Sequence, residues 1–420
     1  MKNKIYKITV IAIAHFMKLI MGFMMLKIMA TYLGADGLGK MANFMSLLTI
    51  ASLIAGGGVL NCLVKYVSEY RESAEKIVIF ISSSINFALF FSIVVCIIVA
   101  LFSKKISFLI FNDESYYKYI LLLAFAQIAI SYINVVYGVI NGLGDNIIFA
   151  KIQSLSSVMT IPFFWWSVHE YHLTGAILAL IVSFVIPILP CLIYGSKNRY
   201  IRKAKIGYFH LSDFKKLSSF TLMLLVSTIS FPIVEIIIRS DFQSITSFHD
   251  VGIWQGAVRL SSAYTGLFSV VLGYWFMPLI SSETSWSRIK TVTFRILFLV
   301  MGIFISGALV FYIFRDFFIT TLLSSKFSEL SDIIIYQIIG DLFKIGAYVI
   351  GFVGVAKAAT RLYILAELIQ GLAFLLFYFI LTQILPTTKG VMMSYALTYI
   401  LYFFISVLFF LWVVSSKIKR

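Results

Sequence analysis

Residues 333–355 read IIIYQIIGDLFKIGAYVIGFVGV, and near the middle of this run an acid, Asp341, and a base, Lys344, stand three residues apart. The run is otherwise apolar or weakly polar, and it is long enough to cross the hydrocarbon core of a bilayer as a helix. A charged side chain at that depth costs roughly 2.5–3.5 kcal/mol. The fold and the function therefore both depend on the solvent that this segment faces.

The rest of the chain has the same apolar character. Of its 420 residues 61% are hydrophobic and 12% are charged, and the mean hydropathy is +0.99. Soluble domains carry about 25% charged residues. Apolar runs of about 20 residues recur throughout, which is typical of a polytopic membrane protein. Cys62, Cys96 and Cys191 lie in such runs without CxxC spacing, which argues against a disulfide framework or a cysteine metal site.

Apolar runs separated by polar or Gly/Pro-rich breaks predict about twelve transmembrane helices. Runs of this length satisfy their backbone hydrogen bonds internally, which favours helices over barrel strands. The predicted spans are residues 8–31, 41–65, 77–102, 118–141, 147–168, 174–195, 218–238, 251–279, 291–314, 332–356, 362–384 and 390–414. The predicted fold class is an all-α polytopic membrane protein.

The basic residues predict the orientation of these helices. If the N-terminus is cytoplasmic, most of the 34 Lys and Arg residues lie in cytoplasmic loops or termini, as the positive-inside rule requires. Both termini are then cytoplasmic. The net charge of +16 needs no nucleic-acid partner, because a basic inner face is what this topology demands.

Short matches between the two halves of the chain share one spacing. The strings GLGKMANF and DVGIWQGA place Gly39 and Gly252 213 residues apart, and VVYGVINGLG matches YVIGFVGVAK at the same offset. FSKKISFLI resembles FRDFFITTL at 212–213 residues. A shared offset near half the chain length predicts a duplication into two six-helix lobes, residues 1–205 and 206–420. Six helices per lobe give both lobes one orientation and predict a central cavity between them.

Two short motifs resemble functional sites but fit them poorly. GADGLGK (residues 34–40) resembles a phosphate-binding loop, yet Met41 stands where a magnesium-binding hydroxyl is needed and no strand precedes it. A tight turn is the better interpretation. HEYH (residues 169–172) has a spacing that could grip a metal, but no third ligand lies nearby. We therefore predict neither a metal site nor a catalytic residue.

Charged residues inside the predicted spans are the strongest candidates for function. They are Lys18, Lys27, Glu235, Arg259, Asp341, Lys344 and Glu367. Such residues must face protein or water. Asp341 and Lys344 are spaced to pair, as are Glu235 and Arg239, so a simple packing role stays open beside a role in a transport pathway. Lys18, Lys27 and Arg259 have no acid one helical turn away in the sequence, and an excess of cations in a cavity suits an anionic passenger.

Four stretches carry a family resemblance: KLIMGFMMLKIMATYLGADGLGKMANF, GGGVLNCLVKYVSEY, DVGIWQGAV and GDLFKIGAYVIGFVGVAKAATRLYILAE. They resemble the Wzx-type lipid-linked oligosaccharide flippases of the multidrug/oligosaccharidyl-lipid/polysaccharide exporter superfamily. The resemblance runs through nearly the whole chain and is closest to translocases for O-antigen units and for the enterobacterial common antigen lipid. It implies twelve helices around a central cavity in the bacterial inner membrane. The implied substrate is undecaprenyl diphosphate carrying a short oligosaccharide, moved from the inner to the outer leaflet by alternating access.

The resemblance also implies site residues. The positions that match family motifs are Lys18, Lys27, Asn61, Lys65, Asp341, Lys344, Lys357, Arg361 and Glu367. With Arg259 added from its place inside a span, the expected substrate-binding residues are Lys18, Lys27, Asn61, Lys65, Arg259, Lys344, Lys357 and Arg361. The candidates for ion coupling are Asp341, Glu235 and Glu367.

No cofactor is expected, and without an ATPase module the drive would be a proton or sodium gradient, the membrane potential or removal of the product. The expected partners are the lipid-linked oligosaccharide, membrane lipids, and the polymerase and chain-length regulator proteins of the same pathway.

Three alternatives share some of these features. A drug or cation exporter of the same superfamily has the same architecture, but would show acids rather than bases without local partners in its cavity. The peptidoglycan-precursor flippase resembles a fourteen-helix protein, and this chain has room for about twelve helices. A glycosyltransferase or O-antigen polymerase usually needs a sizeable outer loop bearing acids or arginines, whereas the outer loops here are short.

Overall fold

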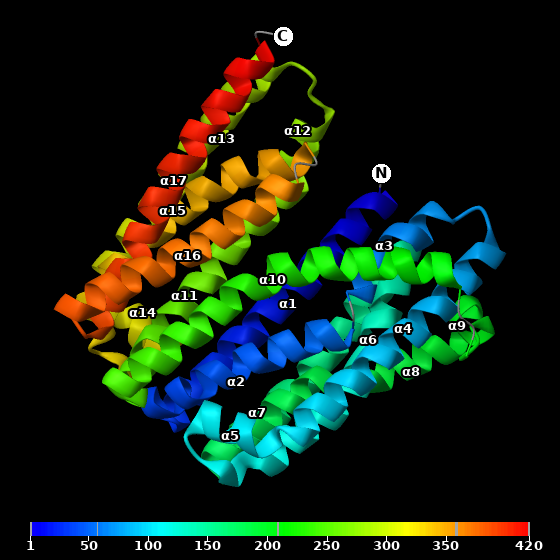
Figure 1. The fold of residues 1–420 in the computed structure, drawn as a ribbon, viewed down its shortest axis with the longest axis horizontal. Coiled ribbons are helices and arrows are strands. Elements are labelled where there is room, and N and C mark those ends of the chain that lie inside the picture. Colours follow the sequence, from blue (N-terminus) through cyan, green and yellow to red (C-terminus); the bar gives the residue numbers. More distant parts are fainter. Residues whose placement is uncertain (1, 57, 208–209, 358–359, 419–420) are drawn as a thin grey trace. The chain divides into compact units, whose positions relative to one another are not determined.

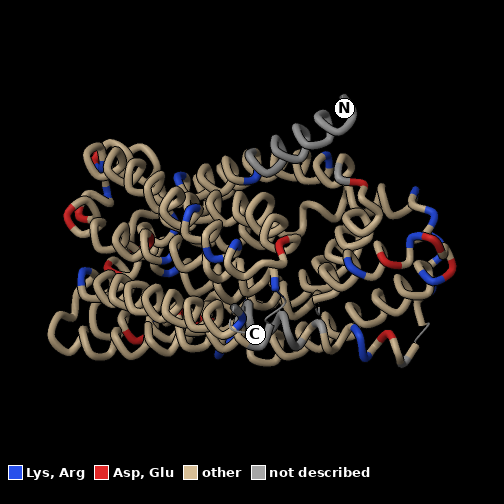
Figure 2. The backbone as a smooth tube through the Cα atoms, turned by 90° about the horizontal axis from the view of Figure 1, so that it is seen from above, with Lys and Arg blue, Asp and Glu red and all other residues tan. Residues whose placement is uncertain are grey.

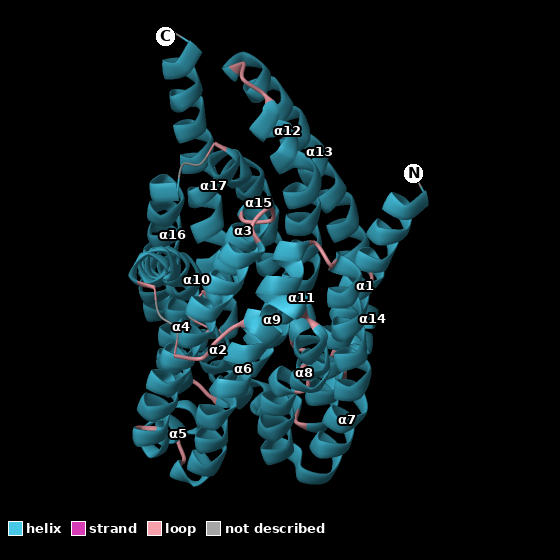
Figure 3. Ribbon diagram, turned by 90° about the vertical axis from the view of Figure 1, so that its right-hand side faces the viewer, coloured by secondary structure: helices cyan, strands magenta, loops and turns pink. Residues whose placement is uncertain are grey.

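The computed structural model of the protein describes residues 2–56, 58–207, 210–357 and 360–418. Over these residues the backbone forms helices joined by short loops, with no strand (Figure 3). Nine helical stretches in the described part are long and apolar enough to cross a bilayer. Long runs of tube without a charged residue separate the Lys, Arg, Asp and Glu positions (Figure 2). The predicted all-α polytopic class is confirmed.

Helices cover all six spans predicted in the first half of the chain. These helices are α1 (Lys2–Tyr32), α2 (Gly34–Ala55), α3 (Val59–Glu69), α4 (Ala74–Leu101), α5 (Ser103–Phe111), α6 (Tyr117–Leu143), α7 (Asn146–Val185), α8 (Ile188–Lys197) and α9 (Arg199–Lys203). The span predicted over 41–65 is divided between α2 and α3, where Gly58 adopts a left-handed φ of 64°. The predicted break near residue 170 is the kink of α7 at His172.

Helices also cover the six spans predicted in the second half. They are α10 (Leu211–Ile245), α11 (Phe248–Val271), α12 (Met277–Ser282), α13 (Trp286–Ile313), α14 (Arg315–Leu322), α15 (Leu330–Ala356), α16 (Thr360–Ile384) and α17 (Thr388–Ile418). A π-helical turn, Leu272–Phe276, separates α11 from α12. Pro278 follows it and cannot donate to the carbonyl one turn earlier, so the hydrogen-bond register of this span changes here.

The chain forms two compact units. Unit 1 comprises Met1–Leu33 and Lys40–Ile229, and unit 2 comprises Gly34–Gly39 and Ser230–Arg420. Two helices therefore contribute to both units: α2 through its first six residues, and α10 through its two halves. The division into lobes at residues 205–206 stays a prediction.

Each unit is built around one central helix. In unit 1, α6 contacts α3, α4, α5, α7 and α8, and α1 packs along α7. In unit 2, α15 contacts α11, α12, α13, α14, α16 and α17 (Figure 1). Gly340 of α15 lies against the ring of Tyr395, and Gly346 lies against Phe403, which lets α17 approach α15 closely. The helix that carries Asp341 and Lys344 is thus the hub of unit 2.

The glycines that share the 213-residue offset meet each other inside unit 2. A Cβ atom on Gly39 would collide with the carbonyl oxygen of Phe248, and one on Gly252 would collide with the carbonyl oxygen of Ala35. Ala35 and Phe248 are also 213 residues apart, so the contact is symmetric under the repeat. The first turns of α2 and α11 therefore cross at a distance that only glycine permits, which supports the predicted duplication.

We expect Gly252→Ala to destabilise the protein by about 2–3 kcal/mol or more, because the added methyl group must push two backbones apart. Gly266→Ala in the same helix is the matched control, because a Cβ atom there meets nothing within 4 Å. Thermal unfolding of the purified proteins in one detergent measures both effects. Equal melting temperatures for the two variants would contradict the tight crossing.

Candidate functional site

A buried polar cluster lies in unit 2 where α11, α15, α16 and α17 converge. We call it the Asp341 cluster, and its members are Ser261, Tyr264, Asp341, Lys344, Gln370, Tyr395 and Tyr399. Every member lies in a helical stretch that is long and apolar enough to span the membrane. It contains both charges from the middle of α15, Asp341 and Lys344.

Asp341 is fully buried, with 0% of its surface exposed. Its carboxylate accepts hydrogen bonds from the hydroxyl of Ser261 at 2.7 Å, from that of Tyr264, and from that of Tyr395 at 2.7 Å. Ser261 and Tyr264 stand three residues apart and share one face of α11, while Tyr395 comes from α17. Three hydroxyl donors replace the water that this carboxylate would otherwise lose on burial.

Lys344 is surrounded by oxygen and aromatic rings. Its ammonium donates to the hydroxyl of Tyr395 at 3.1 Å. Three rings, those of Phe231, Tyr395 and Tyr399, lie with their centroids 5.8, 5.4 and 5.0 Å from Nζ, within the range of cation–π attraction. Among the described residues no direct ion pair joins Asp341 to Lys344. The hydroxyl of Tyr395 bridges them instead, donating to the acid and accepting from the base.

The second predicted pair is confirmed. Arg239 donates to the carboxylate of Glu235 at 2.6 Å, one turn away on α10. The Arg239 side chain is 2% exposed and lies over the ring of Trp254, 5.7 Å from its centroid. Glu235 is therefore held by a neighbour on its own helix, whereas Asp341 is held by residues from two other helices.

The predicted substrate-binding residues of unit 1 lie on two helices. On α1, Lys18 is exposed and Lys27 is partly buried. On α3, Asn61 and Lys65 are both exposed and stand four residues apart, so they share one face of that helix. The Nζ atom of Lys65 lies 4.8 Å from the centroid of the Tyr66 ring.

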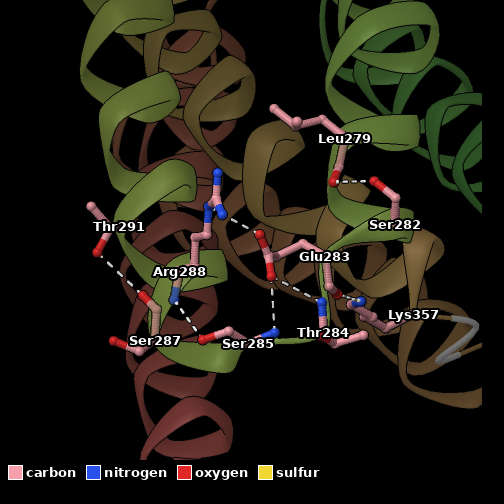
Figure 4. Close-up of polar contacts among 9 residues, drawn as sticks. All are labelled: Leu279, Ser282, Glu283, Thr284, Ser285, Ser287, Arg288, Thr291 and Lys357. Atoms are coloured by element: carbon pink, nitrogen blue, oxygen red, sulfur yellow. Dashed lines mark hydrogen bonds and ion pairs between the residues drawn. The ribbon is translucent and has the colours of Figure 1, made fainter.

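In unit 2, Lys357 anchors a loop. Its ammonium donates to the backbone carbonyl of Glu283 at 2.6 Å (Figure 4). The Glu283 carboxylate in turn accepts the backbone N–H groups of Thr284 and Ser285, each at 3.0 Å, and contacts Nε of Arg288 at 3.1 Å. Lys357 thus ties the end of α15 to the connection between α12 and α13. An ammonium has three donors, so this anchor leaves capacity for a further acceptor.

The remaining predicted residues are Arg259, Glu367 and Arg361. Arg259 lies partly buried on α11 and Glu367 partly buried on α16. The side chain of Arg361 lies outside the described part of the structure. The contacts of Lys344 place this predicted cation in the Asp341 cluster.

The HEYH motif forms a turn. His172 adopts φ 49° at the kink of α7, and the ring of His169 stacks on Trp165 with centroids 5.4 Å apart. Within the described residues no group of three His, Cys, Asp or Glu side chains could hold a metal ion.

Sequence reasoning missed the hydroxyl partners of Asp341. Ser261 and Tyr264 stand at i and i+3, and Tyr395 and Tyr399 at i and i+4, so each pair presents polar groups on one helix face. That spacing inside apolar spans is the signal that could have found them. The amide of Gln370, which donates to the hydroxyl of Tyr399 at 2.8 Å, extends the cluster to α16.

Comparisons with known proteins agree with this architecture. The chain is 29% identical over 393 residues to the lipid III flippase of Escherichia coli strain K12. The aligned region covers 91% of this chain and 92% of that protein. The lipid III flippase of Shigella flexneri matches with the same values. Each is a relative that spans nearly the whole length of the chain.

Solved structures share the fold. An inward-facing multidrug resistance transporter of the MATE family superposes with a TM-score of 0.76 over 96% of each chain, at 13% sequence identity. A lipid II flippase in an inward closed conformation superposes with a TM-score of 0.72, over 95% of this chain and 87% of that one, at 18% identity. Identities this low show the fold alone, which is MATE-like.

The family itself is shown by a profile match. Residues 5–284, two thirds of the chain, match the family described as polysaccharide biosynthesis protein. The family resemblance is thereby confirmed, and three of the four quoted stretches lie within the matched residues. The chain belongs to the polysaccharide biosynthesis protein family.

Proposed function

We propose that the chain is a flippase that moves a lipid-linked oligosaccharide across the bacterial inner membrane, with both termini in the cytoplasm. The observation that carries this proposal is the similarity to the lipid III flippases over 91% of the chain, inside a family of polysaccharide biosynthesis proteins. The function is transport rather than chemistry on the sugars.

The substrate we propose is undecaprenyl diphosphate carrying an O-antigen repeat unit. The enterobacterial common antigen lipid is the alternative, supported by the similarity to the lipid III flippases. A multidrug exporter is the third candidate, supported by the shared fold. Cations inside the predicted spans fit a diphosphate better than a cationic drug.

Substrate capture in this proposal begins with the positive charges of the predicted substrate-binding residues. Lys65 and Arg361 at the cytoplasmic side and Lys18 deeper in the membrane attract the diphosphate, while Lys27, Asn61, Arg259, Lys344 and Lys357 complete the path. The glycan enters a polar cavity, and the polyprenyl tail stays in lipid. Alternating access of the lobes, residues 1–205 and 206–420, then releases the substrate in the outer leaflet, where the polymerase and chain-length regulator proteins act.

Asp341 is the ion-coupling candidate that the geometry favours over Glu235 and Glu367. Its carboxylate is the shared acceptor of three hydroxyl groups from two other helices. Protonation would turn one acceptor oxygen into a donor, so a hydroxyl that now donates to it would have to reorient. A cation such as sodium would compete with the same hydroxyl donors for the oxygens of the Asp341 carboxylate. Either event changes how α11 and α17 are held to α15, which makes the cluster a two-state element.

Rescue of surface glycan in deletion strains decides among the substrates. We expect the chain to restore O-antigen or the enterobacterial common antigen in strains that lack the corresponding flippase. Restoration of one glycan and not the other identifies the repeat unit. If the chain confers resistance to cationic drugs and rescues no glycan, the flippase proposal is wrong and the multidrug exporter alternative is supported.

A further inference from the structure

Unit 1 contains a pocket of about 580 Å³ between the start of α4 and the segment that follows α8. We call it the α4–α9 pocket. It is lined by Ala74, Glu75, Val78, Ile79, Ser82, Arg199, Tyr200, Lys203 and Lys205. The proposed transport path does not use these residues.

The basic wall of the pocket is held in place by hydrogen bonds. The side chain of Asn198 accepts the backbone N–H groups of Tyr200 and Ile201 at 3.0 and 3.1 Å, which caps α9. The backbone N–H of Lys205 donates to the hydroxyl of Ser82 at 3.0 Å. Residues 199–205 are therefore fixed onto α4, and their backbone does not need to be ordered when a ligand binds.

The charges in the pocket favour an anion. Three cations, Arg199, Lys203 and Lys205, face one acid, Glu75. Within the described residues no ion pair involves any of the three cations. The guanidinium of Arg199 lies over the ring of Tyr200, 4.6 Å from its centroid, and donates to its hydroxyl at 2.6 Å. The first turn of α4 also contributes the positive end of its helix dipole.

Apolar side chains from the start of α4 also line the pocket. They are those of Ala74, Val78 and Ile79, in the first two turns of α4. The 28 residues of α4 extend about 42 Å, whereas the hydrocarbon core is about 30 Å thick. The helix ends therefore reach the head-group layer, so basic and apolar side chains of the pocket meet at the level of the lipid phosphates.

We propose that the α4–α9 pocket holds the phosphate head group of a membrane lipid. The phosphate contacts Arg199, Lys203 and Lys205, and the start of the acyl or prenyl chain lies along Val78 and Ile79. Basic pockets at helix ends recognise anionic head groups in this way. An anionic phospholipid of the bilayer and a polyprenyl diphosphate offer the same chemistry. Only the second source rests on the proposed function.

Lipid binding to the purified full-length protein tests the proposal by native mass spectrometry. The probes are phosphatidylglycerol, phosphatidylcholine, undecaprenyl diphosphate and inorganic phosphate. The test variant is Arg199→Gln/Lys203→Gln/Lys205→Gln. The matched control is Lys197→Gln/Arg202→Gln/Lys215→Gln, which removes three exposed cations nearby that do not line the pocket. A basic residue near an anionic surface contributes about 1 kcal/mol, so we expect about 100-fold weaker binding of anionic lipid by the test variant only.

A second variant separates a pocket from a charged surface. Ala74→Trp fills the pocket and keeps every charge, so we expect it to lose anionic lipid as well. Selective binding of phosphatidylglycerol supports a bilayer phospholipid as the ligand, and selective binding of undecaprenyl diphosphate supports the transported lipid. Equal losses in the test and control variants, unchanged binding by Ala74→Trp, or binding of inorganic phosphate without lipid would each overturn the proposal. Glycan rescue by a chain that binds no lipid here would leave the flippase function standing.

Discussion

Replacing Asp341 by Asn is expected to lower transport by about tenfold or more while the protein inserts at normal levels. The carboxylate accepts three hydroxyl groups from α11 and α17, and hydrogen bonds to a charged group contribute about 1.5–3 kcal/mol each. An amide of the same size keeps one acceptor oxygen and presents an NH₂ group to donors. It also removes the group proposed to bind the coupling ion. Glycan display at matched expression measures the effect.

Two further variants separate coupling from packing at this site. Tyr395→Phe removes the hydroxyl that bridges Asp341 and Lys344 and should also lower transport. Asp341→Asn combined with Lys344→Met removes both charges. If the two residues served only to neutralise each other, this double variant would transport normally. Normal transport by the well-expressed double variant would contradict the role proposed for the Asp341 cluster.

Lys18→Gln is expected to remove most surface glycan without reducing protein levels. Lys18 is exposed near the middle of α1, and no ion pair in the described part of the chain includes it. An ammonium at that depth is costly unless water or an anion reaches it, and a diphosphate offers a strong match. Lys18→Arg should keep partial activity, because the positive charge is retained but a planar guanidinium replaces the compact ammonium group. Lys18→Glu should be worse than Lys18→Gln because it repels the diphosphate.

The matched control for Lys18 is Lys104→Gln, which removes an exposed cation from α5. We expect it to display glycan at the level of the parent chain. Equal glycan display by Lys18→Gln and the parent, at matched expression, would remove Lys18 from the proposed pathway. Rescue of Lys18→Glu by reversing an acid elsewhere would instead assign Lys18 a structural ion pair.

The fold could be predicted well from the sequence because span length and hydropathy are local properties. Each of the twelve predicted spans is helical over most of its described residues. The short helices α5, α9 and α14 were not predicted, because they are too short to span and lie in polar connections. The pairing of Gly39 with Gly252 was visible only as a shared spacing, since a sequence offset does not say that two equivalent residues touch.

The site could be predicted in part. Asp341 and Lys344 stood out because charges in apolar segments are rare and costly. Their hydroxyl partners did not, because Ser and Tyr are ordinary in such helices and Ser261 lies 80 residues from Asp341. The anchor at Lys357 could not be predicted, because its acceptor is the backbone carbonyl of Glu283. Every residue has such a carbonyl, so the sequence does not indicate which one accepts the hydrogen bond.

Leaflet movement of a lipid-linked oligosaccharide is the measurement that tests the central claim most directly. The purified chain is reconstituted into proteoliposomes that carry undecaprenyl-diphosphate oligosaccharide in both leaflets, and an impermeant glycan-cleaving enzyme is added outside. We predict that nearly all of the glycan becomes accessible, and that Asp341→Asn slows this by about tenfold or more. Cleavage that stops at the outer leaflet, as in protein-free liposomes, would contradict the account.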